Sequence, residues 1–297
     1  MSNCILCNGI KLLYVTTVRD DANLKVYECN DCGHIQINPP PAIEEDTEYY
    51  ENNIVYRQLI KEDELDDIQL MTKMEQWTLP QVLTLESVVS LSDRILEIGS
   101  GYGWLVEKMR NKGYCFDGVE LNWKQREMAK SRAGVNLLSI NLNIDALPTE
   151  MKGSYDWVCM FHVLEHMKDP VSFLKSAISA LKPNGKIMIE VPNFNDYAKK
   201  ISDNYDKFSY KRQHISYFKE DTLKKAMIYA GIKPVEIKCI QRYSVENALY
   251  WCRNNKPFLE YYQTAVPESL EFVDKYYREK LENSMEADSL VSIGTIE

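Results

Sequence analysis

The sequence predicts an α/β protein built on a doubly wound parallel sheet, with a cysteine-rich module before the sheet and a helical extension after it. Three observations support this fold class. Short apolar runs alternate with helix-like segments between residues 76 and 240, four cysteines form two C-x-x-C pairs near the N-terminus, and the residues after Ile240 are helical in pattern. We therefore expect four parts, over residues 1–38, 39–75, 76–240 and 241–297.

The two cysteine pairs predict a structural zinc site of the zinc-ribbon type. Cys4 and Cys7 form the first knuckle, Cys29 and Cys32 form the second, and 21 residues separate them. Four thiolates complete the tetrahedral shell that Zn²⁺ accepts at about 2.3 Å. The segments YVTTV and LKVYEC between the pairs are typical of a hairpin. A redox pair is the alternative, but two pairs without a following helix favour zinc, and we expect His34 to lie at the surface beside the site.

Three prolines at residues 39–41 predict the boundary of this module. The acidic segment over residues 42–74 is helical in pattern, and a further helix over 76–91 should cover the sheet before its first strand. Three tyrosines of the acidic segment either pack on the next domain or line a substrate cleft, because a phenol offers both an apolar wall and a hydrogen-bonding tip. Both interpretations stay open for Tyr49, Tyr50 and Tyr56.

The segment RILEIGSGYGW, residues 94–104, carries the strongest functional signal. Its apolar run predicts a buried strand, and Gly99, Gly101 and Gly103 follow at every second position before a helix-like segment. Glycines at such a corner permit positive φ and let a ligand approach the main chain. A dinucleotide site of the GxGxxG type would need its third glycine where Trp104 stands. The spacing therefore predicts a nucleotide-binding corner of another kind.

The pattern Glu97-x-Gly99-x-Gly101-x-Gly103 resembles motif I of the class I S-adenosylmethionine-dependent methyltransferases. The resemblance implies a Rossmann-like, seven-stranded sheet and an acid at each of three strand ends. Glu97 would lie at the methionine end of the cofactor, Glu120 on the ribose hydroxyls, and Asp145 at the adenine amino group. Solvated surface acids are the plainer alternative. The cofactor residues expected on this basis are Glu97, Gly99, Ser100, Gly101, Tyr102, Gly103, Glu120, Leu121, Asp145, Ala146, Phe161 and His162.

The rest of the domain follows the same alternation. The turn-like segment LKPNG, Leu181 to Gly185, should end a helix before the fifth strand and resembles the LxPGG turn of that family. We expect strands over residues 94–98, 115–120, 136–140, 156–161, 186–191 and 235–240, and helices near 104–112, 122–133, 169–181 and 220–230.

Two segments bring histidines to the carboxyl edge of the sheet, where ligands bind in open α/β folds. FHVLEHMKDP follows strand four and carries His162, Glu165 and His166. Capping or orienting the loop beside the cofactor site is the simpler role of Glu165 and His166. Catalysis by His166, and after it by His162, is the alternative. The segment RQHISYFKED follows strand five and carries His214.

The second segment, together with the zinc ribbon, the tyrosines and the glycine loop, resembles sugar methyltransferases that act on nucleotide-linked deoxysugars. In that family the motif reads close to EHxSYF, which implies that His214 is the base. Gln213 stands where the family has glutamate, and the carbon-methylating members carry a further C-terminal domain that this sequence lacks. We therefore expect methylation of oxygen rather than carbon.

Composition limits the partners. The net charge is −9 without a basic tract, which disfavours nucleic acid. There is no run of about 18 apolar residues and no signal-like N-terminus, so we expect a cytoplasmic protein without a membrane partner. In a reducing compartment the remaining cysteines should be reduced and structural; they are Cys115, Cys159, Cys239 and Cys252.

The function expected from the sequence is methyl transfer from S-adenosylmethionine to a small molecule, a sugar or nucleotide-linked precursor of a surface polysaccharide. The cofactors are S-adenosylmethionine and a structural zinc ion. His214 is the first candidate base and His166 the second. A homodimer is one use of the C-terminal helices. A protein or RNA methyltransferase and a non-catalytic S-adenosylmethionine-binding protein are the alternatives.

Overall fold

The computed structural model describes residues 3–41, 67–142, 147–256 and 266–296. The chain divides into two compact units, each described by itself. One comprises Met1–Pro41, His162–Lys175 and Met188–Ile296, and the other comprises Ala42–Phe161 and Ser176–Ile187 with the last residue. Tyr49, Tyr50, Tyr56, Asp145 and Ala146 lie outside the described residues, as does most of the predicted acidic helix.

A small antiparallel sheet holds the N-terminal residues. Its order is β1-β2-β3-β8, with β1 at Leu12–Val18, β2 at Asp21–Cys29, β3 at Ile35–Ile37 and β8 at Ser216–Tyr217. The predicted hairpin is confirmed, since Leu12 lies opposite Cys29 in antiparallel register. Side chains of these strands form a common core with Tyr210. The fourth strand comes from the His214 segment, so this sheet fixes the residues that follow His214.

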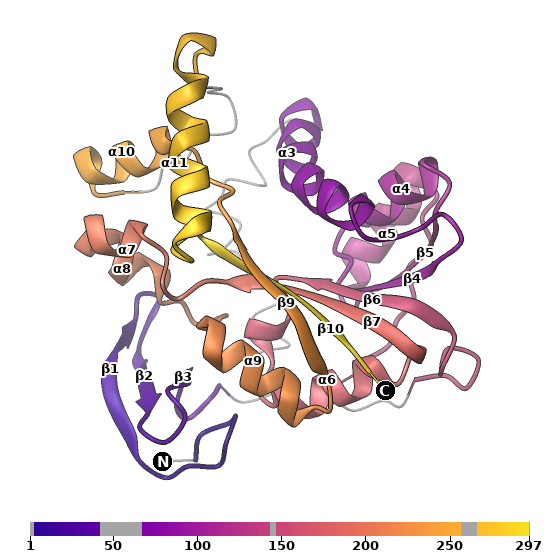
Figure 1. Ribbon diagram of the computed structural model, residues 1–297, viewed down its shortest axis with the longest axis horizontal. Coiled ribbons are helices and arrows are strands. Elements are labelled where there is room, and N and C mark those ends of the chain that lie inside the picture. Colours follow the sequence, from indigo (N-terminus) through magenta and orange to yellow (C-terminus); the bar gives the residue numbers. More distant parts are fainter. Residues whose placement is uncertain (1–2, 42–66, 143–146, 257–265, 297) are drawn as a thin grey trace. The chain divides into compact units, whose positions relative to one another are not determined.

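The larger sheet has the order β5-β4-β6-β7-β10-β9. β4 pairs in parallel with both β5 and β6, as predicted. The two strands β9 and β10 run antiparallel and lie side by side in Figure 1, in orange and yellow. The bounds are β4 Arg94–Ile98, β5 Cys115–Val119, β6 Tyr155–Phe161, β7 Leu181–Pro192, β9 Lys233–Ile240 and β10 Ser289–Thr295.

The sheet differs from the prediction in three places. The strand expected over 136–140 is reduced to one bridge, between Val119 and Leu138, so the larger sheet has six strands among the described residues rather than seven. The expected turn at Leu181–Gly185 is instead the first part of β7, although Asn184 keeps a positive φ of 62°. The C-terminal extension also ends in a strand, β10, because SLVSIGT pairs along the whole of β9.

Helices flank these strands. Three of the predicted helices are confirmed within a residue at each end, as α4, α5 and α9, whereas α6 ends at Ile178 because the chain enters β7 soon afterwards. The helix α5 begins where Asn122 accepts hydrogen bonds from the backbone N–H of Lys124 and Gln125. The helices are α3 Asp67–Glu86, α4 Trp104–Asn111, α5 Trp123–Ala133, α6 Pro170–Ile178, α7 Ala198–Ile201, α8 Asp203–Ser209, α9 Glu220–Tyr229, α10 Val245–Asn254 and α11 Glu271–Asn283.

The C-terminal helices α10 and α11 are present, as the helical pattern predicted. Trp251 of α10 is buried against the rings of Tyr205 and Phe208, in the packing role expected for it. Tyr261 and Tyr262 lie outside the described residues. Among the helices that the structure describes, none has both the length and the apolar character needed to cross a membrane.

Candidate functional site

The glycine corner after β4 adopts the backbone that the sequence predicted. Gly99, Gly101 and Gly103 have φ values of 78°, 53° and 72°. These values lie in the left-handed region, which residues other than glycine rarely adopt. The N–H groups of Gly99 and Ser100 donate to the carbonyl of Val119 at 2.8 and 2.9 Å, which ties the corner to the end of β5.

Two of these glycines are required for different reasons. A Cβ on Gly103 would lie 3.0 Å from the Cβ of Ala129 and 3.2 Å from Val135, so close packing excludes a side chain there. A Cβ on Gly101 would meet no atom of the described residues within 4 Å. As far as the described residues go, the main chain at Gly101 is therefore open to a ligand.

Glu120 is held in place by the corner itself. Its Oε2 accepts a hydrogen bond from the N–H of Gly101 at 2.8 Å, and its Oε1 accepts one from the N–H of Asn122 at the same distance. Each carboxylate oxygen has two lone pairs, so both oxygens keep capacity for a ligand hydroxyl. The structure thus brings Glu120 to the glycines, as predicted.

Glu97, in the strand before the corner, is a buried acid with a hydrogen-bonding position that the described residues leave unfilled. It is buried, and within the described part of the chain its Oε2 has no hydrogen-bond partner. Burial, assisted by the charge of Glu120, raises the pKa of Glu97 to about 8. A cation beside this carboxylate would remove the cost of leaving it buried and unpaired.

The other expected cofactor residues are spread along these elements. Ser100 is buried with its hydroxyl donating to the carbonyl of Glu97, Tyr102 is half-buried, Leu121 is exposed, and Phe161 is buried at the end of β6. Gly118 is a residue that sequence reasoning missed. A Cβ on it would lie 2.5 Å from the hydroxyl of Ser100, so Gly118 lets the corner fold against β5.

A histidine cluster forms in the other unit. Glu165 lies in the 3₁₀ turn Leu164–His166 and is 1% exposed. Its Oε1 lies 3.4 Å from Nδ1 of His162, 3.8 Å from Nε2 of His166 and 3.9 Å from Nε2 of His214. The structure therefore brings together both candidate bases and a carboxylate. From the sequence alone we expect Glu165 only to cap or orient the loop.

Burial and charge determine which of these histidines is protonated. Burial, followed by the charges of Lys211 and His166, holds the pKa of His214 well below its usual value. Burial also lowers the pKa of His166, with Glu165 opposing it. Both imidazoles are therefore neutral near pH 7. The pKa of Glu165 is itself lowered, because the nearby imidazoles outweigh its burial.

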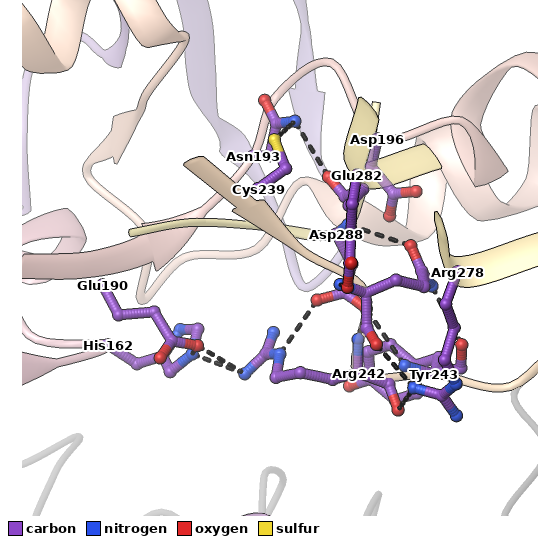
Figure 2. Close-up of polar contacts among 12 residues, drawn as sticks. His162, Glu190, Asn193, Asp196, Cys239, Arg242, Tyr243, Arg278, Glu282 and Asp288 are labelled. Atoms are coloured by element: carbon purple, nitrogen blue, oxygen red, sulfur yellow. Dashed lines mark hydrogen bonds and ion pairs between the residues drawn. The ribbon is translucent and has the colours of Figure 1, made fainter. Parts of the chain in front are cut away.

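His162 belongs to a buried ionic network more than to the expected cofactor site (Figure 2). Its φ of 56° is unusual for a residue other than glycine, and its N–H donates to the carbonyl of Glu190 at 2.9 Å. Its Nε2 lies 3.0 Å from Oε1 of Glu190 and also contacts the guanidinium of Arg242. Burial and Arg242 lower the pKa of His162, but Glu165 and Glu190 outweigh them and raise it.

Arg242 joins two acids in this network. Its guanidinium lies 3.7 Å from Glu190 and 2.9 Å from Asp288, both of which are buried. Sequence reasoning missed all three residues. The one available signal was Glu190, a single acid inside the apolar run KIMIEV of a buried strand.

The four cysteines converge as predicted. The Sγ atoms of Cys4 and Cys32 are 3.6 Å apart, as are those of Cys7 and Cys29, and all four could hold one metal ion. A tetrahedral zinc site with bonds of about 2.3 Å separates its sulfurs by about 3.8 Å. The prediction for His34 is wrong in one respect. His34 is fully buried, with Nε2 3.2 Å from the hydroxyl of Ser216.

The remaining cysteines are free, as expected, and two of them are exposed: Cys115 and Cys252. Cys159 and Cys239 are buried. Burial raises the pKa of the Cys239 thiol to about 11, so this group is protonated near pH 7.

Comparison with known proteins identifies the family of the part of the chain that includes most of the larger sheet. Residues 72–237, more than half of the chain, match the family described as a methyltransferase domain. The ubiquinone biosynthesis O-methyltransferase of Vibrio campbellii is 31% identical over 105 residues, which are 34% of this chain and 45% of that protein. The corresponding enzyme of Bordetella bronchiseptica is 32% identical over 114 residues, 37% and 47% of the two chains. The chain thus spans about half the length of the curated relatives that it matches.

Solved structures share the fold at low sequence identity. One is a 1,6-didemethyltoxoflavin-N1-methyltransferase of Burkholderia thailandensis, with a TM-score of 0.54, 13% identity and coverage of 95% of this chain and 99% of that one. Another is an S-adenosylmethionine-dependent methyltransferase of Archaeoglobus fulgidus, with a TM-score of 0.50, 18% identity and coverage of 86% and 100%. The family match over residues 72–237 shows that the chain belongs to the methyltransferase domain family.

Proposed function

We propose that this protein methylates an oxygen atom of a small-molecule acceptor, a sugar or a nucleotide-linked precursor of a surface polysaccharide. The observation that carries the methyl-transfer part is the left-handed glycine corner with its open main chain at Gly101, in a chain of the methyltransferase domain family. Oxygen is favoured by the curated relatives, which are O-methyltransferases by name. The sugar class rests on the HxSYF resemblance around His214.

The residues at the corner fit the cofactor that the family implies. S-adenosylmethionine carries an ammonium and a sulfonium, and Glu97 offers a buried carboxylate oxygen without a partner in the described chain. Glu120, oriented by the N–H groups of Gly101 and Asn122, is placed to accept the ribose hydroxyls. When bound, the cofactor supplies a methyl group that the sulfonium has already activated.

His214 is the proposed proton acceptor. As the acceptor oxygen forms its bond to the methyl carbon, the hydroxyl must lose its proton, while the electron pair of the broken carbon–sulfur bond stays on sulfur. A neutral imidazole carries a proton on one nitrogen and a lone pair on the other. The carboxylate of Glu165, 3.9 Å from Nε2, favours the tautomer with the proton on Nε2. Nδ1 then accepts the proton of the hydroxyl.

Glu165 supplies the charge that Gln213 lacks. The imidazolium formed on His214 is stabilised by the buried carboxylate of Glu165, whose charge acts strongly where water is excluded. His166 is a positioning residue in this scheme. Its Nδ1 donates to the carbonyl of Gln213 at 2.6 Å, which fixes the backbone immediately before His214.

We also propose that the four cysteines hold one structural zinc ion. The donor set is four thiolates, and their 3.6 Å spacings need little change to match a tetrahedral shell. The same small sheet pairs Ile35 and Gln36 of β3 with Tyr217 and Ser216 of β8. Zinc would therefore stabilise the strand that begins two residues after His214.

A methyl-transfer screen with labelled cofactor tests the proposal. Nucleotide sugars, RNA and protein extracts are offered in parallel, and we expect transfer to the nucleotide-sugar class. His214→Ala should reduce single-turnover transfer about 10²- to 10⁴-fold, the range of a general base, while cofactor affinity stays within about twofold. A His214→Ala variant with the original rate would exclude His214 as the base. Transfer confined to RNA or protein would contradict the proposal of a small-molecule acceptor.

A further inference from the structure

Three of the four histidines of the chain gather around one buried carboxylate. Within the described residues, neither oxygen of Glu165 has a hydrogen-bond partner. Of the three histidines, His162 comes closest, with Nδ1 3.4 Å from Oε1, beyond the usual 2.7–3.2 Å of an N–H···O bond. Both oxygens of this buried carboxylate therefore keep lone pairs that a further ligand could use.

The tautomer of His166 adds a second lone pair close to Glu165. Its Nδ1 lies 2.6 Å from the carbonyl oxygen of Gln213, and a carbonyl oxygen can only accept. Nδ1 therefore carries the proton, and Nε2 of the neutral ring presents a lone pair. This lone pair faces Oε1 of Glu165 at 3.8 Å, so two electron-rich atoms oppose each other in a buried site.

His214 supplies a third atom that could bind a metal ion. Its Nε2 lies 3.9 Å from the same oxygen, and its ring contacts that of His166 with centroids 5.1 Å apart. One donor atom from each of Glu165, His166 and His214 lies within 4.8 Å of the other two. The bond from His166 to the Gln213 carbonyl is also the kind of support that fixes the ring of a metal-binding histidine.

We propose that Glu165, His166 and His214 form a second metal site, which takes one divalent transition-metal ion such as Zn²⁺ or Co²⁺, and that the ion inhibits methyl transfer. Two imidazoles and one carboxylate suit these ions and leave coordination positions for solvent, whereas Mg²⁺ and Ca²⁺ prefer oxygen ligands. Ligands about 2.1 Å from an ion at a tetrahedral angle are about 3.4 Å apart. The two imidazole nitrogens lie only about 0.4–0.5 Å beyond this separation from Oε1 of Glu165.

Inhibition follows from the tautomer of His214 and rests on the proposed function. An ion bound at Nε2 uses the lone pair there, which forces the remaining proton of the neutral ring onto Nδ1. Nδ1 can then no longer accept a proton from the acceptor hydroxyl. The ion also neutralises the Glu165 charge that would stabilise an imidazolium.

Titration of the zinc-loaded 297-residue chain with Co²⁺ tests the metal site. We expect one further equivalent to bind, with a visible d–d spectrum and without the thiolate charge-transfer band that the four-cysteine site would give. Glu165→Gln and His166→Gln should each weaken this binding at least tenfold. Asp169→Asn is the matched control, because it changes an exposed carboxylate in the same loop and keeps an oxygen at the start of α6.

S-adenosylhomocysteine affinity, measured in every variant, verifies the fold and should stay unchanged. A Glu165→Gln protein that binds Co²⁺ as well as wild type, or a spectrum with thiolate bands alone, would overturn the metal site. Methyl transfer should fall as the second equivalent binds, and an unchanged or increased rate would overturn the inhibition. The metal titration needs no acceptor, so its result is separate from the fate of the proposed function.

Discussion

Gly101→Ala should separate the cost of a strained backbone from the cost of blocking a ligand. Gly101 has φ of 53° and open space around its missing Cβ. Gly134, at the C-terminal end of α5, has φ of 66° and equally open space within the described residues. The two positions therefore share a backbone conformation and a lack of packing, but we place the cofactor at Gly101 alone.

The structure sets the size of each effect. A left-handed residue other than glycine costs about 1–2 kcal/mol, and neither site adds a steric clash with described atoms. Both variants should therefore lose similar stability, which corresponds to a melting temperature lower by about 2–8 °C. Gly103→Ala should lose about 1–3 kcal/mol more, because its methyl group would meet Ala129 at 3.0 Å.

Calorimetric titration with S-adenosylhomocysteine then distinguishes the sites. Gly101→Ala should weaken binding at least tenfold, about 1.4 kcal/mol, because its methyl group stands where the ligand approaches the main chain. Gly134→Ala should bind like wild type. Equal affinities in the two variants would refute the assignment of Gly101 to the cofactor site.

Three further predictions concern buried charges and the cysteine site. The pKa of Glu97 in the folded state is raised to about 8, so as pH rises the unfolded state loses this proton first. The stability of the wild type should therefore fall as pH rises from about 4.5 to 8. Glu97→Gln should remove this slope in thermal melts across that range, and parallel curves for the two proteins would contradict the prediction. Arg242→Met leaves the buried acids Asp288 and Glu190 without the cation that they share and should cost about 3–5 kcal/mol in urea unfolding. A loss below about 1 kcal/mol would argue against the network. Cys29→Ser should lower bound zinc by about one ion per chain in elemental analysis, and full retention would exclude the four-thiolate site.

The glycine corner could be predicted from sequence because its determinants are local. A buried strand followed by Gly99, Gly101 and Gly103 specifies a backbone shape with few alternatives, and the observed φ values agree. The same holds for the cysteine knuckles, since a C-x-x-C pair fixes two thiolates within one turn. Here the chemistry is contained in a few consecutive residues.

The histidine cluster could be predicted only in part because its members meet through long-range pairing. His166 contacts the backbone of Gln213, 47 residues away, and Arg242 contacts His162 across 80 residues. Neither periodicity nor spacing encodes such contacts. Glu165 was therefore interpreted as a loop-orienting residue, although it lies at the centre of the cluster.

The strand β10 shows the same limitation at the level of the fold. SLVSIGT is a short run of small and apolar residues after a long helical pattern, so propensity alone could not assign its partner. Its register is set by antiparallel pairing with β9, in which Ser289 lies opposite Ile240. Likewise, His34 was expected at the surface because Ser216, its partner in the folded protein, lies 182 residues away.

Isothermal titration calorimetry of S-adenosylhomocysteine with the purified wild-type chain tests whether the glycine corner binds the cofactor. We expect saturable heat with one site per chain, which Gly101→Ala weakens and His214→Ala leaves unchanged. An absence of binding heat, together with an unchanged melting temperature at saturating ligand, would contradict it.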